Sequence, residues 1–95
     1  MTNQNKIKIN FTPEVLGGVY ANNMLVTHTE EEFIMDFITV FPPEGKIAAR
    51  VISSSRHMKR ILKALEDNIK KYEERYGSLK ESDEPKIKFG FQSPK

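Results

Sequence analysis

Cysteine and tryptophan are absent from this 95-residue sequence, and histidine occurs only twice. Without cysteine the chain can form no disulfide, thiol nucleophile or cysteine-ligated metal site. It has no run of about 18 apolar residues, so we expect no membrane-spanning helix. Its first five residues carry neither the basic nor the apolar block of a signal peptide. We therefore expect a small cytoplasmic protein.

Catalytic signatures are scarce as well. The sequence contains no phosphate-binding loop, nucleotide fingerprint or nucleophile elbow. His28 precedes Glu30-Glu31-Glu32, but successive strand residues point to opposite faces, so this spacing makes a poor metal or acid–base site. We expect no enzyme, no cofactor and no metal. Motifs that read DNA sequence are also missing, which argues against sequence-specific recognition.

The net charge of +2 conceals an uneven distribution. Residues 1–45 hold two lysines against six acids, whereas residues 46–95 hold thirteen basic residues against seven acids. An acidic half and a basic half can complement each other within one chain or between two chains. Solvated faces without a partner would produce the same distribution, and both interpretations stay open.

Alternating polar and apolar residues predict strands over 5–11, 19–28 and 46–53. In the third strand, one face is expected to carry Ile47, Ala49 and Val51. The segment 29–41 fits either a helix, with Thr29 and Glu32 as a capping box, or a strand. We favour the strand because the segment is rich in aromatic and β-branched residues.

A helix is predicted from Ser55 to Tyr76, between N-cap serines and Gly77 as a C′ residue. Its apolar residues recur at intervals of four and three positions, and we call them the apolar stripe: Met58, Leu62, Leu65, Ile69, Tyr72 and Tyr76. Such a stripe packs on the chain's own sheet, or is shared with a helix of a second subunit. Both alternatives are open.

The first two turns of this helix are basic, with no acid before Glu66. Cations oppose the macrodipole there, but free N–H groups and hydroxyls can bind an anion such as phosphate or a nucleic-acid backbone. The candidate anion-binding residues are Arg50, Ser54, Ser55, Arg56, Lys59, Arg60 and Lys63. Pairing with the chain's own acids, such as Glu30 to Glu32, is the alternative.

These elements predict a two-layer α+β domain over residues 1–77: an antiparallel β-meander of three to four strands with one long C-terminal helix packed on it. Residues 78–95 are expected to form a polar tail, in which 86–91 either adds an edge strand or stays irregular. One helix covers one sheet face, so the other would expose apolar side chains. We therefore expect a homodimer or a higher even oligomer.

The residues expected to support self-association come from the sheet and from the helix. They are Phe33, Ile34, Met35, Phe37, Ile38, Leu62, Leu65, Ile69 and Tyr72. The function expected from these features is that of a non-enzymatic binding or assembly module that engages a protein partner. The alternative is a module that binds phosphate or a nucleic-acid backbone through the basic helix turns.

Several short motifs lie between residues 6 and 77: Gly18-Val-Tyr-Ala-Asn22, Val26-Thr-His-Thr-Glu-Glu-Glu-Phe33, Asp36-Phe37, Arg50-Val-Ile-Ser53, His57-Met-Lys-Arg60 and Leu65-Glu-Asp-Asn-Ile-Lys-Lys-Tyr-Glu73. In this combination the chain resembles a family of small prokaryotic proteins catalogued as a domain of unknown function. That family usually has a proline just before the helix, where this chain has Ser55. The resemblance implies no activity and no catalytic residues. The expected architecture also resembles, more loosely, the SecB export chaperones, which suggests a use for apolar grooves in holding a polypeptide.

Overall fold

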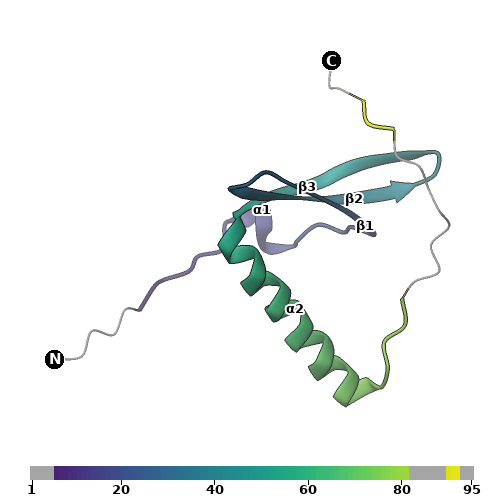
Figure 1. Ribbon diagram of the computed structural model, residues 1–95. Helices are drawn as coiled ribbons and strands as arrows, with labels where there is room; N and C mark the ends of the chain where they lie inside the picture. The colour runs from purple at the N-terminus through teal and green to yellow at the C-terminus, as the bar shows by residue number, and fades with distance from the viewer. Residues whose placement is uncertain (1–5, 82–89, 93–95) are drawn as a thin grey trace. The chain divides into compact units, whose positions relative to one another are not determined.

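The computed structural model describes residues 6–81 and 90–92 (Figure 1). Its elements follow in the order α1 (Pro13–Leu16), β1 (Asn23–His28), β2 (Glu32–Phe41), β3 (Glu44–Ser54) and α2 (Ser55–Tyr76). In the described part of the chain β2 lies between β1 and β3, and both pairings are antiparallel. This confirms the α+β class, with a three-stranded antiparallel meander followed by one long C-terminal helix.

The chain divides into two compact units, Met1–Lys59 and Arg60–Lys95, and the boundary between them falls inside α2. The first unit contains α1, the sheet and the first turn of α2. The second contains the rest of α2 and the described residues that follow it. The packing of the helix on the sheet, and with it the single domain expected over 1–77, stays a prediction.

The ambiguous segment 29–41 forms a strand from Glu32 to Phe41, as favoured, and this strand, β2, is the middle strand of the sheet. The Thr29 and Glu32 pair, which resembled a capping box, instead builds the turn between β1 and β2. The Thr29 hydroxyl accepts hydrogen bonds from the N–H groups of Glu31 and Glu32, at 3.3 and 3.2 Å. The Thr29 N–H donates to the Glu32 carbonyl at 2.9 Å. The same local hydroxyl–amide bonding therefore serves a hairpin here.

An irregularity in β3 changes which of its residues share a face. Phe37 pairs with Ala49 but Ile38 pairs with Ile47, so Ala48 is an extra residue in β3. A bulge of this kind reverses the alternation of side chains beyond it. Ile47 consequently lies on the same face as Ile52, and its expected grouping with Ala49 and Val51 is wrong.

The strand expected over 5–11 is also wrong, because residues 6–12 form no regular element. Alternating polarity stabilises a strand only when a neighbouring strand pairs with it, and no described strand pairs with this segment. The chain forms the short helix α1 next, with Pro13 at its first position. Of the segment 86–91, residues 86–89 lie outside the described residues, and Gly90 and Phe91 form no regular element.

The strand expected over 19–28 begins only at Asn23, because Asn22 ends the ladder with its side chain. The Asn22 amide donates to the Val40 carbonyl at 3.0 Å, and its Oδ1 accepts from the Val40 N–H at 2.9 Å. The Thr39 hydroxyl donates to the Tyr20 carbonyl at 2.5 Å. These bonds hold residues 20–22 against the end of β2.

The helix α2 runs from Ser55 to Tyr76, as predicted. The Ser54 hydroxyl accepts a hydrogen bond from the His57 N–H at 3.2 Å, which makes Ser54 the N-cap. At the other end Gly77 has φ = +90°, a conformation that glycine adopts without a Cβ clash, and its N–H donates to the Glu73 carbonyl. No helix among the described residues is long and apolar enough to cross a membrane.

Candidate functional site

A cross-strand ion pair joins the centre of β2 to β3. Asp36 and Arg50 are directly opposed, and the guanidinium donates to both carboxylate oxygens, at 2.6 and 3.0 Å. Asp36 is only 4 % exposed, whereas the Arg50 side chain is 57 % exposed. The hydrogen bonds from Arg50 lower the pKa of Asp36 against the opposing effect of burial, and the carboxylate raises the pKa of Arg50. The charge of Arg50, one of the cations in the anion site predicted from the sequence, is therefore already compensated by the Asp36 carboxylate.

The N-terminus of α2 is also partly occupied by the chain itself. The His57 N–H donates to the Ser54 hydroxyl, and the Ser55 N–H donates to the Glu31 carbonyl at 3.0 Å. These bonds use two of the backbone groups that an anion at a helix N-terminus would need. The serines thus act first at the junction between β3 and α2.

Four candidate cations stay free of acidic partners within residues 6–81 and 90–92. They are Arg56, Lys59, Arg60 and Lys63, and all four are exposed. The alternative of pairing with Glu30 to Glu32 is not realised among the described side chains. On a helical wheel the four lie within about 100° of one another; Arg56, Arg60 and Lys63 lie on the side of α2 away from the apolar stripe, and Lys59 lies toward its border. They form a solvent-exposed basic face.

The sheet residues predicted for self-association lie on both faces of β2. Phe33, Met35 and Phe37 share one face, while Ile34 and Ile38 lie on the other, beside Asp36. Met35 and Ile38 are each 4 % exposed, and the other three are half-buried. Their flanking neighbours therefore already cover much of these side chains.

Apart from Phe41 at the end of β2, the exposed apolar side chains of the sheet belong instead to its outer strands, which the sequence reasoning missed. One face exposes Met24, Val26 and Val51, and the opposite face exposes Ile47 and Ile52. The signal that could have revealed them is topological. In a three-stranded meander the first and third strands have neighbours on one side only, so their side chains are covered less.

The four helix residues predicted for self-association are exposed. Leu62, Leu65, Ile69 and Tyr72 are between 45 and 56 % exposed, and no residue of α2 is buried. The Tyr72 and Tyr76 rings lie 5.0 Å apart, and the Arg75 guanidinium lies 5.6 Å from the Tyr76 ring centre. These contacts order the C-terminal end of the stripe without covering it.

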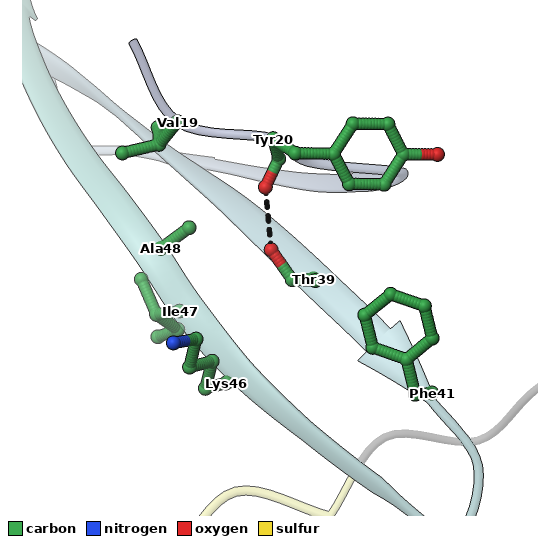
Figure 2. A pocket seen from close by; sticks show the side chains of 7 residues that line it. All are labelled: Val19, Tyr20, Thr39, Phe41, Lys46, Ile47 and Ala48. Carbon is green, nitrogen blue, oxygen red and sulfur yellow. Dashed lines mark hydrogen bonds between the residues drawn. The ribbon is translucent and has the colours of Figure 1, made fainter. Parts of the chain in front are cut away.

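An open hollow of about 470 Å³ lies beside the end of β2 (Figure 2). Its lining residues are Val19, Tyr20, Thr39, Phe41, Lys46, Ile47 and Ala48. The Thr39 hydroxyl in this lining donates to the Tyr20 carbonyl, and Lys46 supplies the cationic group. The lining carries no carboxylate or imidazole that could act as a general acid or base.

One of the two histidines contacts an aromatic ring. The His28 ring lies 5.3 Å from the Phe33 ring, its cross-strand partner. Among the described residues, no group of three or more histidine, aspartate or glutamate side chains could hold a metal ion.

Comparison with known proteins gives a single assignment. A family model described as "Protein of unknown function (DUF3467)" matches residues 1–81. No curated protein and no solved structure matches the chain. The looser likeness to the SecB export chaperones is therefore not confirmed, while the resemblance to a family of unknown function is. The chain belongs to DUF3467, a family of proteins whose function is unknown.

Proposed function

We propose that this chain is a small cytoplasmic module that self-associates, engages a protein partner and has no enzymatic activity. The observation that carries the proposal is the exposed apolar stripe of α2. Six large apolar side chains occupy one side of a 22-residue helix, and none of them is buried. A contiguous apolar surface of this extent is typical of an interface between proteins.

The small buried core supports the same proposal. Among the described apolar side chains, only Met35 and Ile38 are buried. Independently stable domains of this length enclose a contiguous core, or gain the missing burial from another subunit. Self-association would cover exposed apolar residues of α2 or of the outer strands.

The environment of the acidic and imidazole groups supports a non-enzymatic role. Asp36 is held by Arg50, and the His28 ring lies against Phe33. A general base needs an accessible lone pair within reach of a substrate proton. Asp36 is instead used to join β2 to β3.

The test is the mass of the purified chain at micromolar concentration, measured by light scattering after size exclusion. We expect at least twice the 11.0 kDa of one chain, in an even multiple. A mass of one chain throughout this range would contradict self-association.

A second candidate function rests on the unpaired basic face formed by Arg56, Lys59, Arg60 and Lys63. These side chains would bind phosphate groups of a nucleic-acid backbone or of a smaller ligand. Binding of a labelled oligonucleotide, followed by anisotropy, should then weaken with a log–log salt slope of about −3 to −4 for four phosphate contacts. Replacing Arg56 and Lys59 by glutamine should weaken binding more than replacing Lys70 and Lys71, which removes the same charge. An absence of binding at low salt would exclude this candidate.

A further inference from the structure

The apolar stripe and the charges along α2 together select one partner and one orientation. We propose that α2 pairs with α2 of a second copy of this chain in antiparallel orientation, about a twofold axis beside Asp67. The inference rests on the self-association proposed above and specifies the surface and the geometry that produce it.

The spacing of the stripe carries the first step. Its intervals of four, three, four, three and four positions read the same in both directions. Antiparallel alignment about Asp67 therefore sets Met58 against Tyr76 of the partner subunit, Leu62 against the partner's Tyr72 and Leu65 against the partner's Ile69. The twofold axis repeats these three layers, so each stripe residue of one helix meets a stripe residue of the other.

The exposure of the stripe carries the second step. The four central residues, Leu62, Leu65, Ile69 and Tyr72, are each about half exposed in the single chain. Burying them against an identical stripe removes apolar surface from water on both helices at once. The 22 residues of α2 extend over about 33 Å, which accommodates all six layers.

The charges beside the stripe carry the third step, because they distinguish antiparallel from parallel pairing. Lys59, Glu66 and Glu73 each follow a stripe residue directly and lie along one border of it. In the antiparallel pair Lys59 meets the partner's Glu73. The twofold axis repeats this contact, so it occurs twice in the dimer. Glu66 meets the partner's Glu66 near the axis, one unfavourable contact against two favourable ones.

Parallel pairing would instead place the basic first turns of the two helices side by side. Lys59, at the border of the stripe, would then lie near the basic first turns of the partner helix instead of near Glu73, with no acid before Glu66 to compensate. Glu73 remains available for the antiparallel contact. Its Oε2 accepts the Leu79 N–H at 2.9 Å, and Oε1 is left to accept from Lys59 of the partner subunit. The antiparallel pair thus gives part of the basic N-terminal region an acidic partner.

Single cysteine variants can test the orientation, because the chain has no cysteine of its own. Asn68 lies next to the proposed axis, so Asn68→Cys should be cross-linked efficiently by a short bis-maleimide. Tyr76→Cys should not be cross-linked, since antiparallel pairing separates the two Tyr76 positions by about 27 Å along the helix axis. Lys71→Cys, on the far side of the helix, is the matched control and should also remain uncross-linked.

The outcomes separate this inference from the proposed self-association. Cross-linking at position 76, or cross-linking at position 71 as efficient as at 68, would overturn the antiparallel pair. A dimeric mass without cross-linking at 68 would also overturn it, while leaving self-association through the sheet, or through α2 against a sheet, as the result. A mass of one chain for the unmodified protein would remove both proposals.

A charge-swap measurement tests the same geometry independently. Lys59→Glu and Glu73→Lys should each weaken the dimer roughly two- to tenfold, measured as the dissociation constant on dilution. The double variant restores opposite charges in both Lys59–Glu73 contacts, so its dissociation constant should return toward that of the unmodified chain. Additive weakening in the double variant would contradict the proposed contact.

Discussion

At the scale of single residues, Asp36 shows how a polar group is accommodated in the middle of a sheet. In the sequence of β2 it lies between Met35 and Ile38, the two buried apolar residues, and it is as little exposed as they are. An ionised carboxylate in this environment needs a partner, which Arg50 supplies from the directly opposed position of β3. The pair therefore also favours the observed register of β2 and β3.

The lowered pKa of Asp36 makes stability depend on pH in a defined direction. Because the folded pKa lies below that of the unfolded chain, the stabilisation is complete above the unfolded value of about 4. It is lost as pH falls through the folded pKa. We expect Asp36→Asn to lower the melting temperature at pH 7 and to flatten its decline below pH 4.

The control for this prediction is Glu32→Gln, which removes an exposed carboxyl from the same strand and the same face. Thermal unfolding of both variants across pH 2 to 7 would show the contrast. If Asp36→Asn followed the same acid decline as the unmodified chain, the Asp36–Arg50 pair would not be the origin of that decline.

At the scale of elements, local hydrogen bonds decide where strands and helices begin and end. Thr29 closes the turn before β2, Asn22 ends the β1 ladder, and Ser54 starts α2. Each of these side chains binds a backbone group that the element itself leaves without a partner. The boundaries of the elements therefore follow from short-range chemistry.

Removal of the N-cap tests this interpretation for α2. Ser54→Ala deletes the acceptor of the His57 N–H and should reduce stability by about 1 kcal/mol. Ser55→Ala is the matched control, because the contact that Ser55 makes to Glu31 uses its backbone N–H. Urea unfolding followed by circular dichroism measures both changes. Equal stability of the two variants would show that Ser54 is not the effective cap.

At the scale of the whole molecule, exposed apolar surface is the dominant feature. In the first unit it occurs on residues 7–20, at Phe41 and on the outer strands, and in the second it occurs along α2. Among the described residues the buried apolar core is confined to β2. A molecule with this distribution is expected to complete its core by contact with another chain.

A pair of substitutions on α2 distinguishes an interface from a merely exposed surface. Leu65→Asp places a charge in the centre of the apolar stripe and should reduce the mass to one chain and lower the melting temperature. Ala64→Asp adds the same charge on the preceding residue, which lies away from the stripe, and should leave the mass unchanged. An unchanged mass and melting temperature for Leu65→Asp would contradict the interface.

Several elements were predictable because their signals are local. The bounds of α2 follow from a serine cap, an apolar repeat and Gly77, all within one stretch of chain. The strand β2 follows from its β-branched and aromatic residues. The candidate basic face was found for the same reason, since residues that share a helix side are set by helical geometry alone.

Other features depend on partners that are distant in the sequence. Residues 6–12 alternate like a strand but have no described strand beside them, and Ile47 changes face because of the bulge at Ala48. The compensation of Arg50 by Asp36 likewise requires that β2 and β3 pair in one register.

The sequence by itself determined the types of the main elements, the extent of α2, and the apolar and basic sides of that helix. Only the tertiary structure decided which side chains of the sheet are covered, which are left exposed on its outer strands, and which cation is neutralised. The reason is physical. Helical periodicity and capping act over a few residues, whereas strand register and burial depend on segments that meet only when the chain folds.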